Sequence, residues 1–552
     1  MIHHRVTLAV IGISMLLACG QWASAQVRVD VGGVHIQVGD DPRQTREEIV
    51  VLTRGPIHEA FAQPVVFDDE PEFVITRRPP SPLDEIVPDE RPQGRHITWI
   101  PGYWSWDSDR DDFIWVSGCW RAIPPKTSWV PGYWAKSRNG YQWVGGFWYT
   151  ADNDEIEYLP APPDTLDEGP QGIGNADSVW IPGCWVRYEG RYAWRPGFWE
   201  TVRPNWVWEP AHYVRTPRGW VYVEGYWDYS LDRRGVAFLP VYCPPSLYGR
   251  RDFRYSPDVV LDLDVLTLYL FSSPQRRHYY FGDYYGDEYS RAGYRPWYTS
   301  RDHHDSYDPI FVYEQWNHRD DRKWADNQRS EYERRRDDKN LRPARTYDDM
   351  KAKADRTPEK DRRQVQTARP IKDVVSSKTT PFKFDKQDDK AREATANQAK
   401  DARNYRDKRS DWEAPKADTE PKEVVTPREP IRTPPTDSPK PPVRDVTPPD
   451  KDQTPDRGTV SRDQPTRRDI QPEKVKITRS PVTVREPVTD KDLTPPVRPT
   501  QPKLDPDAKP RPRKVDSSDR SKDSSDKSSS DKGKDSSDTN RDKDRDKDKD
   551  KD

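Results

Sequence analysis

The stretch at 99–104, WIPGYW, decides the fold because altered copies of it fill the first half of the chain. The copies read WVSGCW at 115–120, WVPGYW at 129–134, WVGGFW at 143–148, WIPGCW at 180–185, WRPGFW at 194–199, WEPAHY at 208–213 and YVEGYW at 222–227. Successive units start 16, 14 and 14 residues apart in the first set of four, and 14 apart throughout the second. The spacing indicates one four-unit block, duplicated in tandem.

Each unit has the composition of a strand followed by a turn. Six residues rich in Trp, Tyr, Val and Ile precede eight or ten residues that contain turn formers. Nearly every motif also contains Pro or Gly, which disfavours a helix. The two tryptophans of a motif are five positions apart, so a regular strand would point them to opposite faces. The sequence leaves open whether a bulge at the Pro-Gly pair brings both onto one face.

The turns give the expected pairing of the tryptophans. If neighbouring strands are antiparallel, a turn should lie midway between facing tryptophans. Midpoints fall at 109–110 for Trp104 and Trp115, and at 189–190 for Trp185 and Trp194. They also fall at 124–125 for Trp120 and Trp129, and at 203–204 for Trp199 and Trp208. Asn139-Gly140 misses its midpoint by about one residue, which a bulge would absorb.

The predicted fold is therefore all-β. It consists of two tandem four-stranded antiparallel meanders built from 14-residue Trp repeats, followed by a long disordered C-terminal tail. Cross-strand aromatic pairs would stabilise the meanders. The expected repeat core comprises Trp99, Trp104, Trp115, Trp120, Trp129, Trp134, Trp143, Trp148, Trp180, Trp185, Trp194, Trp199 and Trp208.

The motif and its recurrence resemble the YxWGxW (WxxGxW) repeat family of exported bacterial proteins. The resemblance covers roughly residues 84–245, and the doubled Trp motif in register is specific to that family. It implies an exported repeat protein and no particular activity. Ala211 and Tyr222 depart from the pattern in the seventh and eighth units.

Composition separates an ordered part of the chain from a solvated part. The 552 residues are 32% hydrophobic and 34% charged and include 56 prolines, too polar for one core throughout. Of the 22 tryptophans, 17 lie between Trp99 and Trp227. The predicted divisions are a signal peptide (1–25), an N-terminal hairpin and Pro-rich acidic tether (26–83), a first repeat block (84–163), a linker (164–178), a second repeat block (179–245), a Tyr/Arg-rich region with a charged helix (246–344) and a disordered polyampholyte tail (345–552).

The N-terminus is typical of an export signal. A short apolar run at 6–18 precedes ASA at 23–25, which predicts cleavage between Ala25 and Gln26. The alternative is a lipoprotein anchored through Cys19. No later segment is long and apolar enough to span a bilayer. We expect a location in the periplasm, in the cell envelope or outside the cell. There, Cys119, Cys184 and Cys243 would allow one disulfide with three alternative pairings.

The sequence gives no sign of catalysis. Nucleophile elbows, zinc-binding helices and phosphate-binding loops are absent, and a net charge of −3 argues against a nucleic-acid partner. Adjacent His303 and His304 fit a polar loop better than a metal site, so we predict no cofactor and no metal. The first hypothesis is a non-enzymatic structural or interaction module of the cell envelope. The alternative is a module that binds peptidoglycan or extracellular polysaccharide by stacking sugars on Trp106, Tyr133, Tyr226 and Trp227.

Overall fold

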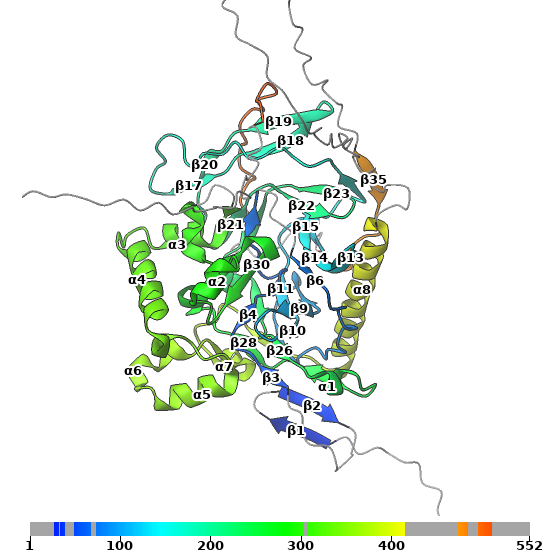
Figure 1. Ribbon diagram of the computed structural model, residues 1–552, viewed down its shortest axis with the longest axis vertical. Helices are drawn as coiled ribbons and strands as arrows, with labels where there is room; N and C mark the ends of the chain where they lie inside the picture. Colours follow the sequence, from blue (N-terminus) through cyan, green and yellow to red (C-terminus); the bar gives the residue numbers. More distant parts are fainter. Residues whose placement is uncertain are drawn as a thin grey trace, which may run out of the picture. The chain divides into compact units, whose positions relative to one another are not determined.

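The computed structural model describes residues 27–31, 34–38, 49–67, 73–302, 306–414, 472–483 and 495–510. Its repeat region consists of four hairpins, each built from two successive motifs (Figure 1). We number the hairpins in chain order and call the two aromatic residues of a motif its first and second Trp.

In every hairpin the strands are interrupted at the motif glycine, which leaves an outer and an inner strand pair. The first hairpin has β8 (Ile97–Ile100) with β11 (Cys119–Ala122), and β9 (Tyr103–Asp107) with β10 (Asp112–Val116). The second has β12 (Thr127–Val130) with β15 (Phe147–Thr150), and β13 (Tyr133–Ser137) with β14 (Gly140–Val144). The third has β17 (Ser178–Ile181) with β20 (Phe198–Thr201), and β18 (Cys184–Tyr188) with β19 (Arg191–Arg195). The fourth has β21 (Trp206–Glu209) with β24 (Tyr226–Tyr229), and β22 (His212–Thr216) with β23 (Gly219–Val223).

The inner pairs confirm part of the predicted register. Trp104 faces Trp115 and Trp185 faces Trp194, in both cases with ring centroids 5.3 Å apart in an edge-to-face arrangement. The turns lie where the midpoints placed them. The second hairpin needs no bulge, because Gly140 is the first residue of β14 and has a φ of +147°. The all-β, antiparallel Trp-repeat fold is confirmed.

The outer pairs correct the rest of the predicted register. Trp120 pairs with Trp99 and not with Trp129, whose partner is Trp148. Likewise Trp199 pairs with Trp180, and Trp208 pairs with Trp227. The connection between the first two hairpins contains Pro124 and Pro125, which have no N–H to extend a ladder. Each motif glycine also ends one ladder, so both tryptophans of a motif pair within their own hairpin.

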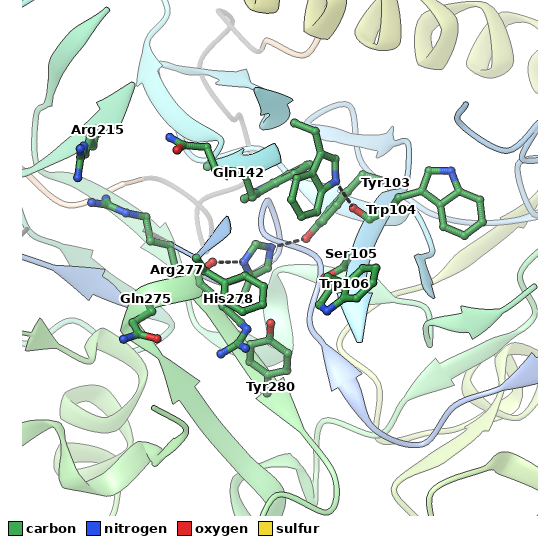
Figure 2. Close-up of a pocket in the computed structure, with 15 residues that line it drawn as sticks. Tyr103, Trp104, Ser105, Trp106, Gln142, Arg215, Gln275, Arg277, His278 and Tyr280 are labelled. Carbon is green, nitrogen blue, oxygen red and sulfur yellow. Dashed lines mark hydrogen bonds between the residues drawn. The ribbon is translucent and has the colours of Figure 1, made fainter. Parts of the chain in front are cut away.

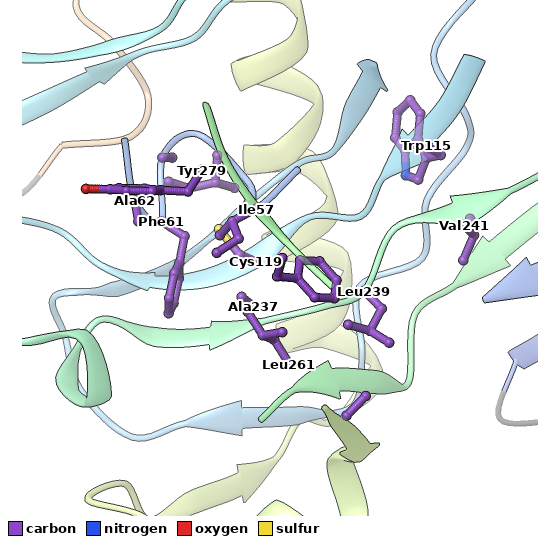
Figure 3. Close-up of a cluster of buried hydrophobic side chains, with 14 of the residues drawn as sticks. Ile57, Phe61, Ala62, Trp115, Cys119, Ala237, Leu239, Val241, Leu261 and Tyr279 are labelled. Atoms are coloured by element: carbon purple, nitrogen blue, oxygen red, sulfur yellow. The ribbon is translucent and has the colours of Figure 1, made fainter. Parts of the chain in front are cut away.

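The sequence left open whether both tryptophans of a motif lie on one face, and the first hairpin shows them packed in different clusters. Trp99 and Trp120 belong to one buried cluster, together with Phe238, and Trp104 and Trp115 belong to another. The second cluster is the main core. Figure 3 shows Trp115 with Phe61, Cys119, Leu239 and Tyr279, among others, contributed by the hairpin, the N-terminal segment and later strands. In the first hairpin the interruption at the glycine thus sends the two pairs into different clusters, whereas in the second hairpin Trp129, Trp148 and Trp134 all pack in or against the main core.

Several strands outside the repeats join the hairpin edges. β25 (Gly235–Ala237) pairs with β11, and β26 (Val241–Tyr242) pairs with β10 and with β3 (Val50–Val51). The N-terminal hairpin is confirmed as β1 (Val27–Val31) and β2 (Val34–Val38), and it pairs further with β27 (Arg254–Ser256). The remaining short strands are β4 (Gly55–Pro56), β5 (Val65–Val66), β6 (Val74–Ile75), β7 (Glu90–Pro92), β16 (Glu155–Tyr158), β28 (Val259–Leu261), β29 (Leu270–Ser273), β30 (His278–Phe281), β31 (Arg295–Pro296), β32 (Ser306–Tyr307), β33 (Ala368–Pro370), β34 (Phe384–Lys386) and β35 (Glu473–Lys476).

A buried network of charges joins the first and fourth hairpins. Arg121 lies 2.6 Å from Asp228, and Arg234 lies 3.1 Å from Asp228 and 2.9 Å from Glu209. All four side chains are almost fully buried. Two positive and two negative groups balance one another there, which is the condition under which buried charges are tolerated.

Helices follow the repeats in the chain. They are α1 (Pro245–Tyr248), α2 (Asp287–Arg291), α3 (Pro309–Asn317), α4 (Trp324–Asp337), α5 (Tyr347–Arg356), α6 (Glu359–Arg362), α7 (Ile371–Ser376) and α8 (Asp389–Glu413). α4 confirms the predicted charged helix, with Glu331 and Arg335 paired at 2.8 Å across one turn. In the described part of the chain, no helix is long and apolar enough to cross a bilayer.

The prediction that the chain has no structure from residue 345 onward is wrong for 347–413 and 473–476. α8, the long yellow helix in Figure 1, packs against β13 and β8. It buries Ala399, Ala402 and Tyr405 on one stripe. The average composition of 345–552 conceals this stripe because small and charged residues supply most of the buried side. Residues 415–471, 484–494 and 511–552 of the predicted tail lie outside the described residues, as do the predicted cleavage site at Ala25 and Gln26, and Cys19.

Candidate functional site

The glycine of each motif lies against an indole of the facing motif. A Cβ atom on Gly118 would be 2.4 Å from the ring of Trp99, and one on Gly102 would be 2.8 Å from the ring of Trp115. The same contact recurs at 2.3–2.6 Å between Gly132 and Trp143, Gly146 and Trp129, Gly183 and Trp194, Gly197 and Trp180, and Gly225 and Trp208. The first Trp of each motif therefore needs a residue without a side chain opposite it.

The two departures from the motif lie in the same hairpin. Ala211 replaces the glycine of the seventh motif, and Tyr222, the first aromatic residue of the eighth motif, faces Tyr213, two residues after Ala211. Both side chains pack against the same cluster, and Tyr222 keeps the ring pair with Tyr213 at 5.3 Å. A phenol ring is smaller than an indole, so the extra methyl group and the smaller ring compensate each other.

A buried carboxylate spans the two glycines of the first hairpin. Glu85 is 5% exposed. Its Oε2 accepts the Gly102 N–H at 3.0 Å, and its Oε1 accepts the Gly118 N–H at 2.8 Å and the Trp115 indole N–H at 3.1 Å. Burial raises the pKa of Glu85, while these three donors act in the opposite direction. The carboxylate satisfies backbone groups that the broken strands leave without partners.

The second and third hairpins have equivalent carboxylates. Glu59 accepts the N–H groups of Gly132 at 2.9 Å and Gly146 at 3.0 Å, and the Trp143 indole N–H at 3.0 Å. In the third hairpin Asp167 accepts the Gly183 N–H and, at 3.4 Å, the Trp180 indole N–H. These three acids lie outside the repeats and at no fixed spacing from them, so the motif alone could not identify them.

The second Trp of several motifs donates its indole N–H to a backbone carbonyl in a proline-rich segment. Trp104 donates to Ser81 at 2.8 Å, Trp185 to Asp164 at 3.0 Å, and Trp227 to Val497 at 3.2 Å. In all three cases the accepting residue directly follows a Pro-Pro pair, at 79–80, 162–163 and 495–496. A fourth case, Trp199 to Gln171 at 2.7 Å, has a single preceding proline.

The first two of these segments, which we call straps, share a sequence. Strap 79–85 reads PPSPLDE and strap 162–168 reads PPDTLDE. Each precedes one repeat block, offers its third residue to a second Trp, and supplies the acid that binds the glycines, Glu85 in one and Asp167 in the other. The duplicated unit therefore includes a strap as well as two hairpins, and residues 164–168 of the predicted linker belong to the second strap.

Arginines from later segments bind the carbonyl groups beside the motif glycines. On α8, Arg409 donates to Pro131 at 2.8 Å and to Gly145 at 2.9 Å, and Arg406 donates to Gly102 at 3.2 Å. Arg409 is fully buried with Glu413, which lies 3.0 Å away. The hairpins thus bind acids through their N–H groups and arginines through their carbonyls.

A small pocket lies where the first and second hairpins meet β30. It holds about 70 Å³ of water-accessible space. Figure 2 shows the His278 ring beside Tyr103, whose hydroxyl lies 2.8 Å from Nε2. The Arg276 carbonyl lies 2.5 Å from Nδ1 of the same ring. Burial lowers the pKa of His278, which favours the neutral ring. Since these polar groups satisfy one another and the space admits only a few waters, the pocket has the character of a packing defect.

A larger groove lies between the third hairpin and α3. It offers about 460 Å³, and its aromatic lining consists of Phe67, Trp180, Trp199, Tyr307 and Trp316. Trp180 and Trp199 are half-buried, with ring centroids 5.7 Å apart. The polar part of the lining includes Glu168, Ser178, Gln315 and Arg319. The volume falls within the range of small-molecule sites.

The structure places the predicted stacking residues in several environments. Tyr133 and Trp227 are only 4% and 6% exposed, so the prediction of an exposed platform is wrong for them. Their rings pack inside and their polar ends donate to Glu413 and Val497. Trp106 and Tyr226 are half-buried, and Trp106 lines the small pocket. None of the four lines the groove at the third hairpin.

The tryptophans expected in the core divide into two groups. Buried are Trp99, Trp104, Trp115, Trp120, Trp129, Trp148, Trp185, Trp194 and Trp208. Half-buried are Trp134, Trp143, Trp180 and Trp199. The sequence could not show this division because the motifs are the same.

The three cysteines in the described part of the chain form no disulfide. Cys119, Cys184 and Cys243 are free and buried, and burial raises the pKa of the thiols of Cys184 and Cys243 to about 12. Among the described residues, no group of three His, Cys, Asp or Glu is placed to hold a metal ion. His303 and His304 lie outside that part.

Comparison with known proteins agrees with the motif. The WXXGXW repeat model matches residues 98–121, 129–149, 179–200 and 203–227, each of which coincides with one hairpin. The repeat region consists of WXXGXW repeats. No curated protein and no solved structure matches the chain.

Proposed function

We propose that this is a non-enzymatic, exported repeat protein that acts as an interaction module of the cell envelope, and that its ligands are extended proline-rich segments. The observation that carries the proposal is the donation from second Trp residues to the carbonyl that follows Pro-Pro, at Ser81, Asp164 and Val497. The chain's own segments occupy these three sites.

The chemistry suits such ligands. Proline lacks an N–H, so a proline-rich segment cannot complete a β-ladder and keeps an extended conformation with outward carbonyls. An indole supplies one donor and a flat apolar face, the combination that proline-binding modules use. The acids and arginines that contact the hairpins are engaged in structural hydrogen bonds, such as Glu85 with Gly102 and Arg409 with Pro131, which supports a binding role over catalysis.

Trp185→Phe tests the proposal because it removes the indole N–H and retains an aromatic ring. We expect amide exchange at Thr165 and Leu166 to accelerate about three- to tenfold, the equivalent of one hydrogen bond. Trp120→Phe is the matched control, since its indole N–H is buried and has no partner. Unchanged exchange at 164–166 in Trp185→Phe would contradict the proposal.

The groove at the third hairpin favours a second candidate, binding of a neutral polysaccharide. Sugar rings stack on aromatic faces, and Trp180, Trp199 and Trp316 border a volume of about 460 Å³. We expect a saturable change in Trp emission with soluble peptidoglycan fragments or another polysaccharide, little affected by salt because stacking is not ionic. Trp316→Ala should abolish the change, and Trp106→Ala, outside the groove, should leave it intact. A response lost equally in both variants would exclude the groove.

A further inference from the structure

The fourth hairpin holds residues 495–498, PPVR, through more than the common indole contact. The Arg498 guanidinium donates to Glu224 Oε1 at 2.7 Å and to the Gly225 carbonyl at 3.3 Å. The Trp227 indole N–H donates to the backbone carbonyl of Val497, the residue before Arg498, at 3.2 Å. The hairpin therefore contacts two consecutive groups of the segment: the carbonyl that follows the Pro-Pro pair, and the arginine.

Glu224 distinguishes this hairpin from the others. Residue 224 precedes the motif glycine of the eighth motif, a position that holds Pro, Ser or Gly in every other motif. A carboxylate at this position can form an ion pair with an arginine, whereas the side chain of Pro101 or Pro131 cannot. The side chain of Val497, in contrast, is 92% exposed, so the hairpin makes little use of its identity.

The ion pair between Arg498 and Glu224 is of a kind that breaks and re-forms readily. The side chains of Arg498 and Glu224 are 51% and 41% exposed, and exposed ion pairs contribute little to stability. The chain contains the same tetrapeptide a second time, at 441–444, outside the described residues. It follows the end of α8 at Glu413 by fewer than 30 residues, an extended reach on the order of 80 Å.

We propose that the fourth hairpin is a binding site for Pro-Pro-x-Arg peptides, and that residues 441–444 of this chain are a second ligand that competes with 495–498. This inference rests on the proposed function and adds the arginine as the specific element. One difference affects the competition: buried Pro499 follows the bound copy, and Asp445 follows the other. The copy at 441–444 is therefore the weaker ligand, and it fills the site when 495–498 is released.

The test uses the full chain with Arg498→Ala and Arg444→Ala together, so that both internal ligands are weakened. A fluorescent peptide of residues 438–448 should bind this double variant saturably and the unaltered chain much more weakly. Replacing the arginine of the peptide by alanine, or adding Glu224→Gln to the chain, should weaken binding about tenfold, the equivalent of about 1.4 kcal/mol. Glu224 is exposed enough for the substitution to leave the fold intact.

A second measurement addresses the segment in its own chain. In Arg498→Ala alone, amides at 443–445 should gain protection from exchange, and they should lose it when Arg444→Ala is added. Equal binding of the peptide with and without its arginine, or no saturable binding to the double variant, would overturn the proposal. Because the Trp185→Phe experiment involves neither Glu224 nor Arg498, its outcome separates a failure of this inference from a failure of the proposed function.

Discussion

Removal of the Glu85 carboxylate should destabilise the protein far more than removal of a neighbouring charge. Among the described residues, Glu85 alone accepts hydrogen bonds from three buried donors, the N–H groups of Gly102 and Gly118 and the indole of Trp115. A buried donor without a partner costs about 1–3 kcal/mol, and partial entry of water reduces the sum. We therefore expect Glu85→Ala to lower the free energy of unfolding by about 3–5 kcal/mol. That is a large share of the stability of an ordinary domain.

Glu85→Gln should lower the free energy of unfolding by a smaller amount, which the geometry of the site also predicts. A glutamine oxygen in place of Oε1 keeps the bonds to Gly118 and Trp115, but its amino group then faces the Gly102 N–H. Loss of the hydrogen bond from the Gly102 N–H should lower the free energy of unfolding by about 1–3 kcal/mol. Urea unfolding followed by Trp fluorescence measures both variants. Asp84→Asn is the control, since Asp84 is exposed and pairs only with Arg254 at the surface. If Glu85→Ala came within 0.5 kcal/mol of that control, roughly the spread of surface substitutions, the role assigned to the carboxylate would be refuted.

Three further predictions concern other parts of the chain. Gly118→Ala should cost about 1–3 kcal/mol by overpacking against Trp99, and Trp99→Tyr in the same chain should recover part of the loss; a double-mutant cycle without favourable coupling would contradict the compensation. Glu413→Ala should cost about 3–5 kcal/mol in urea unfolding because it leaves Arg409 buried without its partner, whereas a truly disordered tail would predict no change. His58 should remain neutral down to about pH 3, because burial lowers its pKa to about 3. Its contribution to the free energy of unfolding is complete above pH 6.5 and is lost as the pH falls toward 3. An NMR titration of His58 with a midpoint near pH 6.5 would contradict this.

The sequence predicts the repeat and the inner pairs because both depend on local signals. The period, the turn residues and the aromatic positions indicate that Trp104 faces Trp115 without knowledge of the rest of the chain. The same reasoning fails between hairpins, where midpoints at 124–125 and 203–204 are equally good by spacing. Pro124 and Pro125 could have decided against a ladder there, since two adjacent residues without N–H groups do not suit a paired strand end.

What the sequence could not predict depends on distant segments. Glu59, Glu85 and Asp167 are ordinary acids in Pro-rich stretches until the fold brings them to the motif glycines. α8 was hidden by an average over 345–552, although Ala399, Ala402, Tyr405 and Arg409 recur at helical spacing and Asp388 caps the helix. The prediction of an exposed aromatic platform was wrong for Trp227 because the motif has the same sequence whether its tryptophan is buried or exposed.

The two tryptophans of a motif make different contacts, which explains why the motif contains both. The first indole lies on the glycine opposite, and in three hairpins its N–H also binds the buried acid. The second indole of five motifs donates its N–H to a carbonyl outside its own hairpin. Trp134 donates to the backbone of Trp104 at 2.9 Å.

The second block repeats this link with a tyrosine. Tyr213, in the position of a second Trp, donates its hydroxyl to the backbone of Trp185 at 2.9 Å. Both links run from the first motif of one hairpin to the first motif of the hairpin before it. The identity of the ring can therefore change as long as the donor remains. We infer that what the duplication preserves at the second position is an apolar ring that ends in a hydrogen-bond donor, the same group that the proline-rich segments require.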